Sequence, residues 1–235
     1  MAARCHTLAL RQPMATVRPE KDHGMSLLMF ATDPSQVVIV TDTLATHPTG
    51  EPFLLVSKCS IVPHLEMAVA YTGVAQVGQR WVHQLQTAVL ARNIDLLDQH
   101  VPGALRQVTA DVVAEFGELP GTSTVYHFGY SEEKEAYIGF AYRSKQDFQS
   151  DPIQYGFGVK PVPSGDFSAP QDIAGLVALG KQIRAEQDAG PKEARIYIGG
   201  EFWMTVLANR TIQVSKLFRF DDFEEQWLQM NASLP

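Results

Sequence analysis

The stretch Val37-Val-Ile-Val-Thr-Asp-Thr-Leu-Ala-Thr46 decides the fold of this chain. Its run of β-branched apolar residues predicts a buried strand that ends at Asp42. An apolar segment over residues 26–31 precedes it and predicts another strand. The residues between the two, Asp33-Pro-Ser-Gln36, have the composition of a tight turn. We therefore expect an antiparallel β-hairpin over residues 26–42.

Outward from this hairpin, the hydrophobic period separates strands from helices. Short apolar runs predict strands, whereas apolar residues three and four positions apart predict amphipathic helices. The further strands that we expect are 53–61, 66–71, 123–130, 136–143, 153–159, 195–198, 202–207 and 211–218. The helices that we expect are 74–92, 102–116, 170–187 with its N-cap near Ser168 or Ala169, and a short helix over 221–230.

The order of these elements indicates the fold class. Strands and helices come in separate runs, which is typical of α+β proteins rather than of alternating βαβ units. The natural packing is two antiparallel sheets face to face with helices outside, a four-layer αββα sandwich. Val113, Phe116 and Ile173 fall on the helix faces that we expect to be buried.

Composition and charge exclude several classes of protein. With 235 residues, 45% of them hydrophobic, the chain is long enough for one large globular domain. A net charge of −7 and a pI near 5.5 disfavour nucleic acid or an anionic membrane as the main partner. The longest apolar stretches have about five residues. A spanning helix needs ~20, so we expect no transmembrane segment.

Cysteine and motif content narrow the chemistry. The two cysteines, Cys5 and Cys59, argue against a disulfide scaffold and fit a reducing compartment, so we expect a cytoplasmic protein. The sequence contains no GxGxxG or Walker loop, no GxSxG elbow, no HExxH and no CxxC, and its seven histidines are scattered. We therefore expect no cofactor and no metal site.

The first 24 residues differ from the rest. They carry four basic residues against two acidic ones, and they lack the apolar core of a secretory signal. We interpret residues 1–24 as a leader or disordered extension, which is either a propeptide or the product of a start codon assigned too far upstream. Residues 25–235 are then expected to form a single domain.

Several short motifs, taken in order, resemble those of a known family. Asp42 ends a strand, and Lys58 follows it by 16 residues. Ala70-Tyr-Thr-Gly73 closes an apolar strand ahead of a long helix, and Gln187-Asp-Ala-Gly190 forms a turn after a later helix. This order resembles the proteasome β-type subunits, a branch of the N-terminal nucleophile (Ntn) hydrolases, over about residues 26–220. The resemblance implies the αββα sandwich, a homo-oligomeric ring and a peptide or amide substrate.

The resemblance also implies a catalytic centre built around a processed N-terminus. Ser26, exposed by processing, would be the nucleophile, and its free α-amine would be the base. An α-amine ordinarily has a pKa of about 7.7–8.0, which is close to working pH. Lys58 would stabilise the ionised hydroxyl by its charge. Asp42 would pair with Lys58 and fix its geometry.

A second group of site residues follows from the same resemblance. Asp188 would orient the N-terminus. A backbone N–H near Thr72 and Gly73 would be the oxyanion donor. Thr46 would meet the substrate backbone from the wall of the cleft.

The register of the nucleophile leaves two alternatives open. The chain reads His23-Gly-Met-Ser-Leu27, so removal of an initiating Met25, or cleavage after it, exposes Ser26. A slip of one or two residues instead places Met25 or Gly24 at the nucleophile position. With Met25 there, the protein would be a catalytically inactive relative.

Three departures from the family pattern bear on the same question. Leu44 stands where the family commonly has an arginine, Phe157 replaces a serine in Gly156-Phe-Gly158, and Gly190-Pro191 replaces another supporting serine. The alternative hypothesis is therefore a non-catalytic proteasome-like subunit with an assembly or scaffolding role. A third is a small-molecule-binding α+β domain without catalysis.

Overall fold

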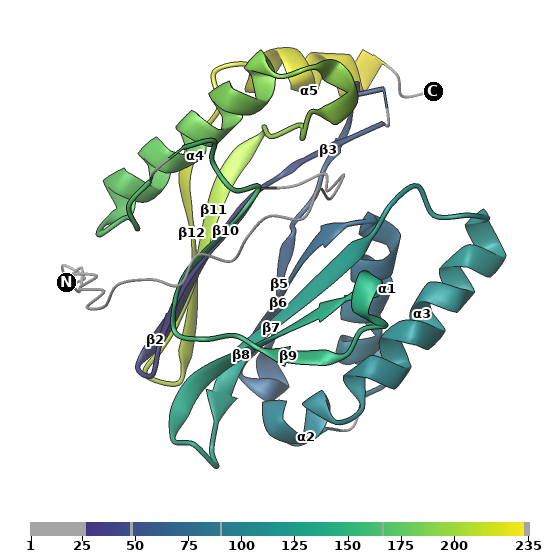
Figure 1. The fold of residues 1–235 in the computed structure, drawn as a ribbon, viewed down its shortest axis with the longest axis vertical. Helices are drawn as coiled ribbons and strands as arrows, with labels where there is room; N and C mark the ends of the chain where they lie inside the picture. Colours follow the sequence, from purple (N-terminus) through teal and green to yellow (C-terminus); the bar gives the residue numbers. More distant parts are fainter. Residues whose placement is uncertain (1–26, 48, 90, 166, 233–235) are drawn as a thin grey trace.

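The computed structural model describes residues 27–47, 49–89, 91–165 and 167–232. The predicted nucleophile Ser26, its alternatives Met25 and Gly24, and the predicted leader 1–24 lie outside the described residues. The described chain forms two five-stranded antiparallel sheets and a two-stranded hairpin, with helices on the outer faces of the sheets (Figure 1).

The first sheet has the strand order β10-β1-β2-β11-β12, and the second has the order β5-β6-β7-β8-β9. The strands are β1 (Leu28–Asp33), β2 (Gln36–Asp42), β3 (Leu44–Thr46), β4 (Pro52–Leu55), β5 (Cys59–Val62), β6 (Met67–Gly73), β7 (Ser123–Ser131), β8 (Ala136–Arg143), β9 (Ser150–Pro152), β10 (Gly156–Lys160), β11 (Glu201–Ala208) and β12 (Thr211–Arg219). The helices are α1 (Ala75–Thr87), α2 (Ile94–Asp98), α3 (Val101–Phe116), α4 (Ile173–Ala189) and α5 (Phe223–Ala232).

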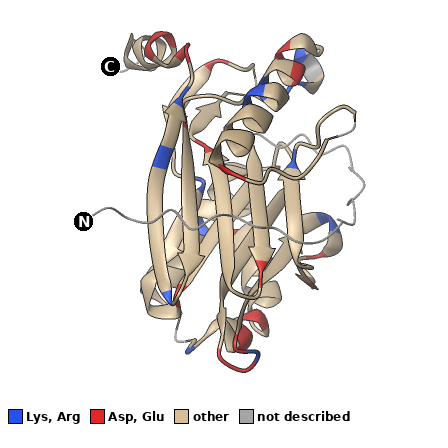
Figure 2. Cartoon of the chain, turned by 90° about the vertical axis from the view of Figure 1, so that its left-hand side faces the viewer, with Lys and Arg blue, Asp and Glu red and all other residues tan. Residues whose placement is uncertain are grey.

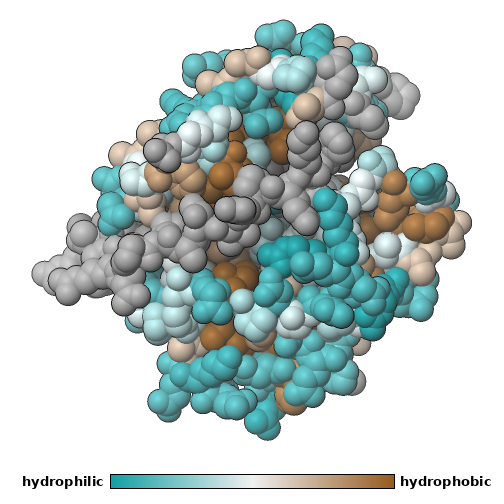
Figure 3. All heavy atoms as spheres, viewed as in Figure 1, coloured by the Kyte–Doolittle hydropathy of each residue, from teal (hydrophilic) through white to brown (hydrophobic). Residues whose placement is uncertain are grey.

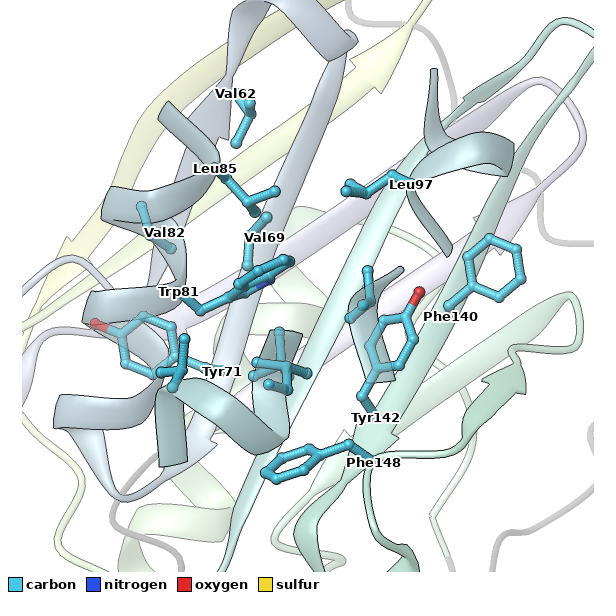
Figure 4. Close-up of a cluster of buried hydrophobic side chains, with 14 of the residues drawn as sticks. Val62, Val69, Tyr71, Trp81, Val82, Leu85, Leu97, Phe140, Tyr142 and Phe148 are labelled. Atoms are coloured by element: carbon cyan, nitrogen blue, oxygen red, sulfur yellow. The ribbon is translucent and has the colours of Figure 1, made fainter. Parts of the chain in front are cut away.

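Three buried apolar clusters separate the four layers. Between the sheets, residues such as Val37 and Ile39 of β2 meet Ala68 and Ala70 of β6. Outside the second sheet, α1, α2 and α3 form another cluster, in which Trp81 and Leu85 face the strands (Figure 4). Outside the first sheet, Leu176, Leu179 and Ile183 of α4 form the third. The predicted α+β fold with an αββα sandwich is confirmed.

One glycine sets how closely α4 approaches its sheet. A Cβ at Gly180 would lie 2.0 Å from the ring of Phe202, a fully buried residue of β11. The helix can therefore touch the aromatic ring only because position 180 has no side chain. This contact keeps α4 directly above the end of the sheet that carries Asp42, since Phe202 is the β11 partner of Asp42.

Two predicted strands are corrected by the structure. The run 53–61 is split: β4 pairs with β3, whereas β5 pairs with β6 in the second sheet. The break at 56–58 occurs because the chain crosses there between sheets, and Val56 N–H donates to the Thr43 carbonyl. The predicted strand 195–198 lies outside every ladder of the described residues. Side chains of α4 take up its backbone groups instead: Ile196 N–H donates to Gln187, and the Ile198 carbonyl accepts from Arg184.

The helix predictions also need correction at their ends and faces. The helix expected over 170–187 begins at Ile173, because the Asp172 side chain accepts from Gly175 N–H and caps it, rather than Ser168 or Ala169. The helix expected over 74–92 ends at Thr87, and the short α2 was not predicted. Val113 is exposed because it is turned about 100° around the helix from the buried Val112. Ile173, the first residue of α4, is exposed as well. Phe116 is exposed too, at the end of α3 under the Arg80 guanidinium.

The surface carries interspersed charges. Acidic and basic residues are mixed over the side seen in Figure 2, and the lower part of the face in Figure 3 is mainly hydrophilic. Within the described ranges, no helix has the length and apolar character that crossing a membrane requires.

A buried histidine gives the fold a pH-dependent stability. His127 of β7 is fully buried and accepts a hydrogen bond from Trp81 Nε1 at 2.8 Å. Burial lowers the pKa of His127 to about 3. Between about pH 6.5, the usual value for a free histidine, and about pH 3, the unfolded chain therefore binds a proton that the folded chain does not. The stability from a neutral His127 is complete above that window and is lost as the pH falls through it.

As the pH falls through this window, we expect the free energy of unfolding to decrease by up to ~1.4 kcal/mol per pH unit through His127 alone. The variant His127→Gln keeps an acceptor for Trp81 but does not titrate, so its slope against pH should be smaller by about that amount. Urea unfolding at several pH values measures the slope. The matched control is His83→Gln at an exposed position of α1, and identical slopes for both variants would contradict the assignment.

Candidate active site

The centre of the candidate site is a buried ion pair. Asp42 is the last residue of β2 and is 0% exposed, and Lys58, between β4 and β5, is 3% exposed. Lys58 Nζ lies 2.8 Å from Asp42 Oδ1. The predicted pairing of these two residues is thus present in the geometry, across 16 residues of sequence.

The Asp42 carboxylate gathers three segments of the chain. Oδ1 also accepts from Leu27 N–H at 2.9 Å, and Oδ2 accepts from Gly199 N–H at 3.1 Å. Hydrogen bonds to an ionised carboxylate are stronger than neutral ones, so these donors stabilise its charge inside the protein. Leu27, the segment between β4 and β5 that carries Lys58, and the loop before β11 therefore meet at the Asp42 carboxylate.

Burial also tunes the lysine. Lys58 Nζ donates to the Leu44 carbonyl at 2.6 Å as well as to Asp42. Desolvation lowers the pKa of Lys58 below its ordinary value, and the Asp42 charge and hydrogen bond offset part of that shift. A buried lysine with a specific carboxylate partner and a lowered pKa is a candidate functional group.

The predicted residues Thr46 and Thr72 belong to strands that are hydrogen-bonded to Lys58. The Leu44 carbonyl that accepts from Lys58 begins the strand that ends at Thr46, and Tyr71 N–H donates to the Lys58 carbonyl. Both threonine side chains are buried, and neither hydroxyl has a hydrogen-bond partner among the described residues. Buried hydroxyls without a partner are uncommon in folded proteins, so these two positions stand out.

Gly73 ends β6 in a conformation that suits glycine. Its φ is +91°, and a Cβ there would lie 1.9 Å from the Thr122 carbonyl oxygen. A pocket of about 250 Å³ opens nearby, on the α1 side of β5 and β6. Besides Val56 and Val82 its walls are neutral polar residues and one histidine: Ser57, Ser60, Tyr71, Gln79, His83 and Gln86.

Asp188 occupies a different environment from Asp42. It is in the last turn of α4 with a 43% exposed side chain, and its carboxylate accepts from Arg184 Nε at 2.5 Å. Among the described residues, the contacts of this carboxylate lead to Arg184 rather than to Asp42 or Lys58. Its predicted role at the N-terminus stays a prediction, as does that of Ser26.

Two main-chain donors at the site were not foreseen. Leu27 and Gly199 bind Asp42 through their main-chain N–H groups, and Gly199 falls just after residues predicted to be a strand. The Gly199-Gly200 pair was the available signal, because adjacent glycines often mark a turn or a close backbone approach. The Phe157 side chain, by contrast, packs into the core beneath α4.

No group of three or more His, Cys, Asp or Glu side chains could hold a metal ion within the described part of the chain.

Comparison with solved structures identifies the fold. The structure of Anbu (ancestral beta-subunit) from Yersinia bercovieri matches with a TM-score of 0.59 at 12% sequence identity, covering 89% of this chain and 97% of that chain. The likeness shows a proteasome-like sandwich fold. No protein-family model and no curated protein matches this chain by sequence.

Proposed function

We propose that this chain is a proteasome-like N-terminal nucleophile amide hydrolase, a peptidase that uses Ser26 at a processed N-terminus. The observation that carries the proposal is the buried Asp42–Lys58 pair. Taking two charges out of water is expensive, and such a pair is weak evidence for a purely stabilising role. A lysine with a lowered pKa, held by a fully buried carboxylate, has instead the properties of a group used in chemistry.

The chain connection supports Ser26 as the nucleophile. Leu27 is covalently joined to Ser26, and its N–H donates to the oxygen of Asp42 that also binds Lys58. The hydrogen bond therefore fixes the first described residue beside the ion pair. A hydroxyl on the preceding residue would be within the electrostatic influence of the Lys58 ammonium.

The proposed reaction has two steps. The Ser26 hydroxyl oxygen attacks the carbonyl carbon of the amide while its α-amine takes the hydroxyl proton. The tetrahedral intermediate then collapses, the C–N bond breaks, and the proton passes to the leaving amine, which leaves an ester on Ser26. Water, deprotonated by the same amine, hydrolyses that ester and regenerates the hydroxyl.

The other residues would bind charge and substrate. Lys58 would stabilise the Ser26 alkoxide by its charge, and a backbone N–H near Thr72 and Gly73 would stabilise the oxyanion. Thr46 would meet the substrate backbone from the wall of the cleft. Asp188 would orient the N-terminus, directly or through its partner Arg184.

The proposal extends to processing and assembly. The leader 1–24 would be removed together with Met25, so that Ser26 becomes the first residue of the single domain, and the mature chain would form a cytoplasmic homo-oligomeric ring. The structural neighbour is itself described as a beta-subunit, which supports an oligomeric assembly. The partners would be peptide or amide substrates rather than nucleic acid or membrane.

A catalytically inactive subunit with an assembly role is the second candidate. Two observations favour it: the Asp188 carboxylate contacts Arg184 rather than the ion pair, and Phe157 packs into the core where the family pattern has a serine. The mature N-terminus separates the two candidates, because only a free amine on Ser26 can serve as the base.

We expect the protein expressed from its own locus to begin at Ser26, measured by intact mass and N-terminal sequencing. We also expect a β-lactone to add one acyl group to the wild type and none to Ser26→Ala. A chain that keeps residues 1–25 and does not react would favour the assembly role.

A further inference from the structure

Arg184 connects α4 to the loop beside the ion pair. Its Nη1 donates to the Ile198 carbonyl at 2.5 Å, its Nη2 to Asp222 Oδ2 at 2.8 Å, and its Nε to Asp188 Oδ2 at 2.5 Å. The guanidinium also lies 5.3 Å from the centre of the Phe220 ring. All three nitrogens of the guanidinium are therefore engaged, a geometry that a lysine cannot reproduce.

One peptide group lies between Arg184 and Asp42. The Ile198 carbonyl and the Gly199 N–H belong to the same planar unit, so a constraint on one end constrains the other. Arg184 holds the oxygen end, and Asp42 Oδ2 accepts from the nitrogen end at 3.1 Å. A cation that binds the carbonyl also polarises the peptide and strengthens its N–H as a donor.

The surrounding contacts keep this peptide in place. The Gly199 carbonyl accepts from Thr43 N–H and Leu44 N–H. A Cβ at Gly199 would lie 2.8 Å from the Leu44 side chain, so the loop approaches β3 more closely than another residue type allows. Gln226 binds Gly200 N–H through its oxygen and Asp222 through its nitrogen, which joins α5 to the same network.

We propose that Arg184 is a positioning residue for the Asp42–Lys58 pair. It holds the Ile198 carbonyl, which keeps the Gly199 N–H directed at Asp42, and Asp42 in turn holds Lys58. Asp188 and Asp222 anchor the guanidinium in this position. The consequence for catalysis rests on the proposed hydrolase function, whereas the link from Arg184 to Asp42 does not.

The link is tested without any activity. In Arg184→Gln we expect the Gly199 amide to exchange with solvent about tenfold faster or more, because a charge-assisted hydrogen bond is lost. Hydrogen exchange read out by NMR or mass spectrometry measures it. The matched control is Arg195→Gln, whose guanidinium binds the Asp188 and Gly190 carbonyls at the end of α4, and it should leave Gly199 unchanged.

A conservative variant guards against a folding failure. Arg184→Lys keeps a cation between Asp188 and Asp222 but cannot reach three acceptors at once, so Gly199 exchange should fall between wild type and Arg184→Gln. For hydrolysis we expect kcat to drop about tenfold in Arg184→Gln with KM unchanged, since the guanidinium is engaged by Asp188, Ile198 and Asp222 of the chain itself, and to recover partly in Arg184→Lys.

Wild-type Gly199 exchange in both Arg184 variants would overturn the proposal. If the wild-type protein hydrolyses no amide but Gly199 exchange changes as expected, the link stands and the hydrolase function fails. If hydrolysis is found but both Arg184 variants keep wild-type exchange and kcat, the hydrolase function stands and the positioning role fails.

Discussion

Amide hydrolysis should fall by about 100- to 1,000-fold in Lys58→Ala, while the chain stays folded. The physical reason is that Lys58 is the buried cation of the candidate site, and removing one preorganised group that stabilises developing charge costs about 100- to 1,000-fold in other enzymes. The fold should survive because Asp42 keeps its hydrogen bonds from Leu27 N–H and Gly199 N–H.

The measurement is kcat/KM on a peptide amide, with circular dichroism to verify folding. The matched control is Lys216→Ala, which removes a lysine that is 44% exposed and paired with Glu201 on the surface, and it should hydrolyse as the wild type does. Hydrolysis at the wild-type rate by folded Lys58→Ala would contradict the proposed mechanism.

Asp42→Asn should produce the largest loss of stability, about 3–5 kcal/mol. The substitution removes the carboxylate that balances the buried Lys58 charge, and it turns an acceptor of three hydrogen bonds into a side chain with one acceptor oxygen. Activity should fall as well, because the same carboxylate fixes Lys58. Urea unfolding gives the stability and the peptide assay gives the rate.

The loss should also depend on pH, with a sign set by Lys58. Its pKa in the folded chain is already lowered by burial, and the Asp42 charge that raises it is gone in the variant. Between the lowered pKa of the folded variant and the ordinary lysine pKa of 10.5, the unfolded chain binds more protons than the folded one, so the free energy of unfolding rises with pH. In the wild type the same rise begins at a higher pH, because the Asp42 charge raises the pKa of Lys58. The deficit of Asp42→Asn should therefore be smaller near pH 9 than near pH 6.

An exposed ion pair supplies the comparison. Asp151→Asn removes a carboxylate that is 54% exposed and paired with Arg143, and such pairs contribute about 0–1 kcal/mol. Equal stability losses in Asp42→Asn and Asp151→Asn would contradict this prediction, because the buried Asp42–Lys58 pair would then contribute no more than an exposed pair.

The sequence predicts local features of this protein well. The hydrophobic pattern of 37–42 predicts β2 to within one residue, and the separate runs of strands and helices predict the four layers. The pairing of Asp42 with Lys58 follows from the spacing that resembles the family. Each of these depends on the side chains of a short segment, which a single sequence displays directly.

The features that were missed depend on the backbone and on distant segments. Gly199 contributes a main-chain N–H, which every residue except proline has, and its partner Asp42 lies 157 residues away in the sequence. No pattern of side chains therefore predicts this contact. The split of 53–61 has a similar cause, since both halves are suitable for strands and only the change of sheet separates them. Arg184 resembles any other helix arginine until the Ile198 carbonyl is placed beneath it.

The convergence on Asp42 has a consequence for the order of folding. Its carboxylate needs one donor 15 residues before it, one 16 residues after it and one 157 residues after it. Contacts of large sequence separation close late, because the chain must first lose the entropy of the intervening loop. On the ribosome, most of the chain must emerge before Gly199 can reach β2. A partly synthesised chain can therefore hold Asp42 and Lys58 while lacking the complete carboxylate environment, and the site is complete only when the last β-hairpin of the sandwich has docked.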